Sequence, residues 1–111
     1  MRFMYIVTSR NGHMMPNQAL MDAINGIRDR EIKAGRMIDD GGLMPVATGA
    51  QVKISDKALS VIDGPFVEAK EVIGGYALMS ARSKAEVVEH VRRFLGVVAE
   101  GTCEIHQLFE V

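Results

Sequence analysis

The chain has 111 residues, 48% of them apolar and 24% charged, which is the composition of one folded domain spanning residues 1–111. Its 13 Lys and Arg are balanced by 14 Asp and Glu and form no basic cluster, which argues against direct nucleic-acid binding. The single cysteine excludes an internal disulfide, no apolar stretch is long enough for a membrane span or a signal peptide, and we therefore expect a cytoplasmic protein.

The N-terminal third predicts a strand and a helix. Residues 3–8 form an apolar run with Tyr, Ile and Val, which is typical of a strand, and residues 9–15 form the loop after it. Residues 16–34 predict a helix that begins at a proline and is ended by Gly35. Glu31 falls near the middle of the apolar stripe of this helix, and we expect its side chain to reach solvent.

The middle of the chain predicts only strands and turns. Residues 36–39 form a short strand that ends in an Asp-Asp-Gly-Gly turn at 39–42. Apolar and polar residues then alternate over 50–63 on both sides of a Ser-Asp-Lys turn at 55–57, which predicts a hairpin. A further strand covers residues 76–81 and is introduced by two glycines.

The last third predicts a second helix and a closing strand. Ser83 and Glu86 have the spacing of a capping box, in which each side chain satisfies a backbone N–H at a helix start. The apolar residues that follow have a helical repeat: Val87, Val91, Phe94, Leu95 and Val98. His90 is expected on or beside the polar flank of this helix, and residues 102–111 predict the last strand.

This order of elements predicts a ferredoxin-like α+β fold, an antiparallel sheet with two helices on one face. A sheet with one wet face would alternate sharply between apolar and polar residues. Here Phe3 and Tyr5 point to one side, while Met4 and Ile6, which are also apolar, point to the other. The uncovered face therefore needs a second layer, and we expect a homodimer in which a twin subunit supplies it.

A charged segment follows the predicted hairpin. Asp63 ends an apolar strand and is held by a turn at Gly64-Pro65, so its carboxylate is expected at a fixed position. Glu68, Lys70 and Glu71 follow within eight residues, and carboxylates beside a lysine can supply an acid and a base from one loop. The alternative is that Asp63 only accepts hydrogen bonds from the turn and the other three form a solvated ion-pair loop.

His13, in the loop after the first strand, is a second candidate for proton transfer. Its side chain could act as a general base if Asp40 or Asp63 oriented it, and the alternative is an exposed loop histidine. Lys70 or Tyr76 could hold an anionic or carbonyl group of a ligand. The three histidines lack metal-ligand spacing and no cofactor motif is present, so we expect neither a metal nor another cofactor.

The run Asp-Gly-Pro-Phe-Val-Glu-Ala-Lys-Glu at 63–71, followed by Gly-Gly-Tyr at 74–76, resembles the YCII-related proteins and, among them, the branch named for its Asp-Gly-Pro-Phe stretch. The helix end Lys-Ala-Gly and the turn Gly-Gly-Leu-Met-Pro at 41–45 extend the resemblance over nearly the whole chain. The resemblance implies a ferredoxin-like subunit that dimerises sheet to sheet into an α+β barrel, with a cleft between sheet and loops. Relatives include enzymes with a His–Asp pair in the cleft and members encoded beside sigma factors.

Together these features lead us to expect a homodimer that binds a small polar metabolite and possesses acid–base chemistry of the isomerase or lyase kind. The residues expected to perform it are His13 and Asp63 as catalytic groups and Asp40, Glu68, Lys70, Glu71 and Tyr76 as ligand-binding groups. The alternative is a non-catalytic interaction module linked to transcription, in which the charged loop is only turn structure.

Overall fold

The computed structural model describes residues 1–9, 17–44, 48–64 and 72–110. Its elements, in chain order, are β1 (Arg2–Ser9), α1 (Gln18–Lys33), β2 (Met37–Gly42), β3 (Ala50–Ser55), β4 (Ala58–Asp63), β5 (Val72–Ser80), α2 (Lys84–Val98) and β6 (Thr102–Gln107). The predicted site residues His13, Glu68, Lys70 and Glu71 lie outside the described residues.

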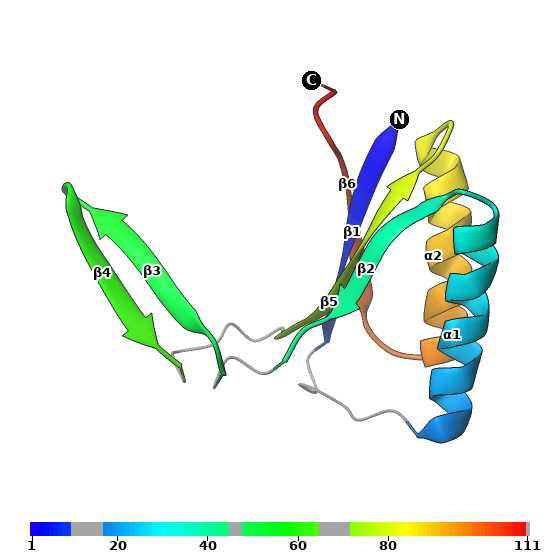
Figure 1. Ribbon diagram of the computed structural model, residues 1–111, viewed down its shortest axis with the longest axis horizontal. Coiled ribbons are helices and arrows are strands. Elements are labelled where there is room, and N and C mark those ends of the chain that lie inside the picture. Colours follow the sequence, from blue (N-terminus) through cyan, green and yellow to red (C-terminus); the bar gives the residue numbers. More distant parts are fainter. Residues whose placement is uncertain (10–16, 45–47, 65–71, 111) are drawn as a thin grey trace.

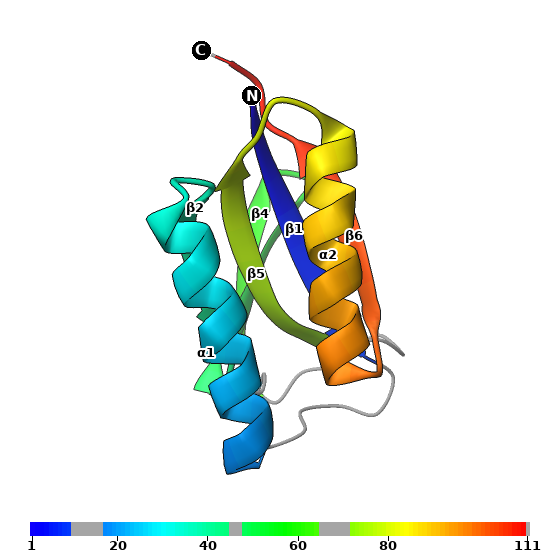
Figure 2. The ribbon, with the colours of Figure 1, turned by 90° about the vertical axis from the view of Figure 1, so that its right-hand side faces the viewer.

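Four of the strands form one antiparallel sheet in the order β2-β5-β1-β6. Both helices lie on the same face of this sheet, α2 alongside β1 and β6 and α1 toward β5 and β2 (Figure 2). The predicted α+β ferredoxin-like layout is therefore confirmed. No helix in the described parts of the chain is long and apolar enough to cross a membrane.

Local signals set the helix ends close to the predicted positions, and α1 spans Gln18–Lys33 where 16–34 had been expected. The Asn17 side chain accepts a hydrogen bond from the Leu20 N–H at 2.8 Å and begins α1. Gly35, with φ +75°, follows its end, because a glycine adopts this left-handed conformation without a Cβ clash. Ser83 accepts from the Glu86 N–H at 3.4 Å and begins α2.

The core lies between the sheet and α2. Alternate residues of the two central strands point toward the helices, and α2 returns its own apolar stripe. The buried apolar residues are Phe3, Tyr5, Met37, Ala77, Met79, Ala81, Val87 and Val91. Among the described residues of α1 only Glu31 is fully buried, so this helix adds mainly half-buried apolar side chains.

Glu31 and His90 were placed wrongly by the sequence analysis. The Glu31 residue is 2% exposed and His90 is 4% exposed, although solvent and a polar helix flank had been expected for them. Both are buried because each has a polar partner in the interior: Arg36 binds Glu31, and the Tyr5 hydroxyl lies against His90. Burial of such groups is tolerated when a hydrogen bond replaces the lost water.

The strand β2 also differs from the expectation, because residues 39–42 continue the strand instead of turning. Gly41 pairs with Tyr76 and Gly42 with Gly75, so the two glycine pairs extend the ladder between β2 and β5. The close approach requires a glycine: a Cβ on Gly75 would lie 2.8 Å from the Gly41 carbonyl oxygen. β5 begins at Val72 rather than at 76, because its first residues pair with Ser9 and Thr8 of β1.

The predicted hairpin is confirmed and forms a sheet of its own. β3 and β4 pair from Ala50↔Asp63 to Ser55↔Ala58 through a two-residue turn at Asp56 and Lys57, whose φ values are +50° and +68°. All residues of both strands are exposed. In Figure 1 the hairpin lies on the side of the four-stranded sheet opposite to the helices, separated from it.

A candidate ligand-binding face of the sheet

The face of the four-stranded sheet that points away from the helices, called the outer face below, is covered by no described helix (Figures 1 and 2). Two rows of cross-strand neighbours run across it: Asp39, Leu78, Met4 and His106 in one, and Gly41, Tyr76, Ile6 and Glu104 in the other. Their side chains share this face because directly opposed residues in a sheet point to the same side. The outer face therefore has an apolar centre and polar groups toward both edges.

Tyr76 and Asp39 form the polar pair at the β2 edge. The Tyr76 hydroxyl donates a hydrogen bond to Oδ2 of Asp39 at 3.3 Å. The tyrosine ring lies across Gly41, since a Cβ there would be 3.0 Å from the ring carbon Cε1. The charge of Asp39 raises the pKa of Tyr76, and partial burial of the phenol adds to this effect.

His106 and Glu104 form the polar pair at the β6 edge. Nε2 of His106 lies 2.9 Å from Oε1 of Glu104, and both side chains are exposed. A carboxylate that binds one ring nitrogen fixes the orientation of the imidazole and leaves the other nitrogen for a second partner. The outer face thus brings a protonated phenol and a carboxylate-oriented imidazole to opposite sides of one apolar patch.

These groups can bind and carry out proton transfer on a small molecule. Met4, Ile6 and Leu78 offer an apolar surface for a flat ligand, and each of these side chains is already half-buried by its neighbours. The Tyr76 hydroxyl, whose one proton is directed at Asp39, can accept a hydrogen bond from a ligand or turn its proton to a ligand oxygen. An imidazole oriented by a carboxylate can accept a proton. Among the described residues no group of three or more His, Cys, Asp and Glu side chains could hold a metal ion.

The residues predicted for the site fall into separate places. Tyr76 is part of the outer face, whereas Asp40 points to the helix side, where both its carboxylate oxygens accept hydrogen bonds from Nε of Arg28 at 2.8 and 2.9 Å. The hydrogen bond to this carboxylate, together with its negative charge, raises the pKa of Arg28. Asp63 pairs with Ala50 at the base of the hairpin. Tyr76, Asp40 and Asp63 therefore do not converge within one chain.

Three residues of the outer face were not singled out by sequence reasoning, namely Asp39, Glu104 and His106. Asp39 was assigned to a turn, and without the extension of β2 its pairing opposite Leu78 could not be foreseen. His106 and Glu104 were available from the pattern, because alternation along residues 102–107 places them together on one face, with Ile105 on the other. The sequence signal for this pair was that both residues fall on the same face of the predicted strand, and no motif marks them.

A second polar cluster lies in the interior, on the helix side of the sheet. Oη of Tyr5 is 3.0 Å from Nε2 of His90, and Nδ1 of His90 is 3.8 Å from Oε1 of Glu31. Arg36 donates from Nε to the other oxygen of Glu31 at 2.6 Å. Burial raises the pKa of Tyr5 well above its usual value and lowers that of His90, whereas the Arg36 hydrogen bond lowers the pKa of Glu31. The cluster ties β1, α1 and α2 together.

The lone cysteine belongs to the packing. Cys103 lies on β6, half-buried against the core cluster. Burial raises the pKa of its thiol to about 11. A thiol that keeps its proton at neutral pH is a weak nucleophile, so Cys103 acts as a small apolar side chain.

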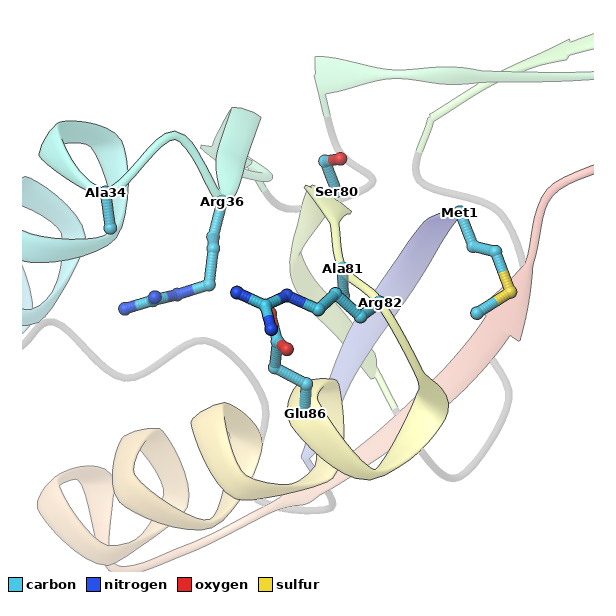
Figure 3. Close-up of a pocket in the computed structure, with 7 residues that line it drawn as sticks. All are labelled: Met1, Ala34, Arg36, Ser80, Ala81, Arg82 and Glu86. Atoms are coloured by element: carbon cyan, nitrogen blue, oxygen red, sulfur yellow. The ribbon is translucent and has the colours of Figure 1, made fainter.

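An open pocket of about 350 Å³ lies near the N-terminus of the chain, where α1 ends and α2 begins (Figure 3). Its polar lining comes mainly from Arg36, Arg82, Glu86 and Ser80. The Arg36 charge is neutralised by its pair with buried Glu31, and Glu86 adds a further negative charge to the lining. These features give the pocket little attraction for an anion, and the outer face is the better candidate for ligand binding.

Comparison with known proteins agrees with this fold. The chain resembles an uncharacterised protein of Rhizobium meliloti (strain 1021), with 26% identity over 76 residues that cover 68% of this chain and 61% of that protein, so it spans less than two thirds of that relative. Among solved structures it is similar to 5-chloro-2-hydroxyhydroquinone dehydrochlorinase from Burkholderia phenoliruptrix AC1100 in complex with 2,5-dihydroxybenzoquinone, with a TM-score of 0.54, 14% identity, and coverage of 100% of this chain and 96% of that one. The family model of the YCII-related domain matches residues 1–111, and the protein therefore belongs to the YCII-related family.

Proposed function

We propose that the protein is a homodimer that binds a small polar metabolite on the outer face of its sheet and performs acid–base chemistry on it. The observation that carries this proposal is the Tyr76–Asp39 pair, a phenol oriented by a carboxylate beside an apolar patch that no described element of the chain covers. With its single proton directed at Asp39, this phenol can accept a hydrogen bond from a ligand hydroxyl, and it donates to a carbonyl or anionic oxygen of the ligand when it turns away from Asp39.

The need for a second subunit is supported by the apolar centre of the outer face and by the shape of the chain. Met4, Ile6 and Leu78 occupy adjoining positions on the outer face. The radius of gyration is 15.9 Å, against about 13 Å for a compact chain of about 100 residues. A twin sheet packed on this face would remove the apolar centre from water and leave the polar pairs at the edges of the closed space.

The residues predicted from the sequence remain part of the proposal. Ser9, the last described residue before the segment that carries His13, pairs with Val72, the first described residue after a second segment. That second segment carries Glu68, Lys70 and Glu71. We assign His13 and Asp63 to proton transfer and Glu68, Lys70 and Glu71 to ligand binding at this end, with Tyr76; Asp40 then supports the β2 edge through Arg28.

The comparisons support the direction of this proposal. The dehydrochlorinase of similar fold binds a planar dihydroxybenzoquinone, which fits a flat apolar patch with hydrogen-bonding groups at its edges. The Asp-Gly-Pro-Phe run further supports membership of the branch named for it within the YCII-related family. The lone reduced cysteine supports a cytoplasmic location.

The test is a ligand-induced shift of the melting temperature, with 2,5-dihydroxybenzoquinone and hydroquinone as planar probes and succinate as a flexible one. The wild type should gain stability with a planar probe, and Tyr76→Phe and Asp39→Ala should lose most of that gain, because each removes one partner of the phenol–carboxylate hydrogen bond. Glu89→Gln, on the exposed face of α2, is the control and should respond like the wild type.

Equal responses of all four proteins would contradict the site. No response of the wild type to any probe would contradict the function. A lone monomer in solution, together with that result, would favour the interaction-module alternative.

A further inference from the structure

The β3–β4 hairpin has one apolar and one polar face. Directly opposed residues share a side of the ladder, so the pairs Val52↔Val61 and Ile54↔Leu59 form one continuous apolar strip. The opposite side carries the pairs Gln51↔Ile62 and Lys53↔Ser60, in which only Ile62 is strongly apolar. An apolar side opposite a polar side is typical of a hairpin that uses one of its two faces to pack on another surface.

Nothing described in the same chain covers this strip. Its four side chains belong to residues that are 65–72% exposed. β3 and β4 make their substantial contacts only with each other among the described elements. A two-stranded hairpin alone is marginally stable in water. Exposure of four adjoining aliphatic side chains to water is unfavourable and indicates a surface that contacts another one. The hairpin therefore needs a surface outside its own chain.

A second copy of this chain is the occupant that the structure favours. The hairpin and the uncovered outer face lie on the same side of the molecule (Figure 1), so a two-fold axis that brings two outer faces together also brings each hairpin beside the other subunit. The formal net charge of −1 gives two copies little mutual repulsion. The residues on the apolar side of the hairpin, added to the outward residues of the four sheet strands, approach the roughly 20–30 residues per side of a stable interface.

We infer that the β3–β4 hairpin is an exchanged arm: its apolar strip (Val52, Ile54, Leu59 and Val61) packs against the partner subunit beside the partner's outer face. This inference rests on the proposed function, and it adds that each ligand site is walled by two chains. Asp63 travels with the arm, because it ends β4 and pairs with Ala50 at the hairpin base. Its carboxylate thus serves the site on the partner, which accounts for its separation from Tyr76 within one chain.

Two variants of adjacent residues test the arm. Val61→Lys places a charge in the apolar strip, whereas Ile62→Lys places the same charge on the opposite side of the same strand. Sedimentation equilibrium should show that Val61→Lys raises the dimer dissociation constant by at least about tenfold. Ile62→Lys should leave it within about twofold. Equal effects of the two substitutions, or none from Val61→Lys, would overturn the exchanged arm.

Hydrogen exchange of the wild type separates exchange between chains from folding back onto the same chain. Backbone amides of β3 and β4 should lose protection when the dimer is diluted into monomers, while those of β1 and β5 keep it. Protection of the hairpin that does not change with dilution would overturn the inference. Both readouts are independent of ligand: a dimer with a protected arm that binds no planar probe refutes the proposed function and leaves the arm intact.

Discussion

Oη of Tyr5 lies 3.0 Å from Nε2 of His90 in the core, and their rings approach to 5.5 Å between centroids. This contact joins β1, which carries Tyr5, to the middle of α2, which carries His90. On the far side of the imidazole, Nδ1 is buried and has no hydrogen-bond partner among the described residues, although a Glu31 oxygen is 3.8 Å away. His90 is thus held neutral between a phenol and a carboxylate that is already engaged by Arg36.

The first prediction is a loss of stability on mild acidification that depends on His90. Burial lowers the pKa of His90 below the usual value, with Arg93 and Arg36 acting in the same direction and Glu31 opposing them. An unfolded histidine has a pKa of about 6.5. Between that pH and the folded pKa the unfolded chain binds more protons, so the free energy of unfolding falls as the pH falls through this window.

The Glu31 carboxyl gives a second acid-side loss at lower pH. The hydrogen bond from Arg36 lowers its pKa, so its stabilisation is complete above the unfolded pKa of about 4.3 and is lost as the pH falls below it. Urea unfolding at neutral pH and at about pH 5.5 should show the histidine effect alone. His90→Gln should flatten the dependence in this upper window and keep the loss below it.

Tyr5→Phe is the matched control for the pH experiment. It removes one hydrogen bond to His90 without changing the imidazole, and it should cost about 1 kcal/mol at every pH. Because the histidine remains buried, the slope of stability against pH should stay as in the wild type. A flat dependence in the wild type, or an unchanged one in His90→Gln, would contradict the assignment.

The second prediction concerns the partner of the buried carboxylate. Arg36→Ala removes the guanidinium that binds both oxygens of Glu31, at 2.6 and 3.2 Å. The residue left behind is 2% exposed, so the free energy of unfolding should fall by about 1–3 kcal/mol at neutral pH. Arg28→Ala breaks a pair of similar geometry on the surface, and its melting temperature should stay near that of the wild type. Equal melting temperatures for the two variants would contradict a structural role of the buried pair.

Local signals predicted part of the fold well because their causes are local. Asn17, Gly35 and Ser83 act within one helical turn, and the two-residue turn at Asp56-Lys57 is read from the residues that flank it. The two helices that form a layer on the sheet were predicted from the helical repeat of their apolar residues. These features need no knowledge of which segments meet.

The interior and the outer face could not be predicted in the same way, because they depend on pairing between distant segments. Glu31 is buried only because Arg36 and His90 meet it, and Asp39 joins the outer face only because β2 continues along β5. A carboxylate in an apolar stripe and an Asp-Asp-Gly-Gly sequence both have commoner local explanations. Tertiary contacts overrode those explanations here.

The third prediction compares two neighbouring glycines of β5. A Cβ on Gly75 would lie 2.8 Å from the Gly41 carbonyl oxygen, which is backbone and can move only with the strand. Gly75→Ala should therefore separate β2 from β5 and cost about 1–3 kcal/mol in urea unfolding. At Gly74 the nearest atom to a Cβ is 4.0 Å away, so Gly74→Ala should be tolerated. If both variants unfold at the same urea concentration, the close approach of β2 does not limit the sheet.

The fourth prediction uses Gly41, over which the Tyr76 ring lies. A Cβ at this position would be 3.0 Å from Cε1 and 3.3 Å from the hydroxyl oxygen, and a side chain can move away where a backbone cannot. Gly41→Ala should therefore leave the melting temperature near that of the wild type but displace the phenol from Asp39. The shift produced by 2,5-dihydroxybenzoquinone should fall as it does in Tyr76→Phe.

Gly42→Ala tests whether the effect at Gly41 is specific. It lies in the same strand, and a Cβ there would be 3.9 Å from the nearest atom, the Gly74 carbonyl oxygen. This variant keeps the Tyr76–Asp39 hydrogen bond and should respond to the probe like the wild type. A reduced response in both glycine variants would mean that the β2 edge as a whole supports binding, whereas a full response in Gly41→Ala would show that the position of the phenol does not matter. Only the difference between the two variants identifies the Tyr76 hydroxyl as the group that meets the ligand.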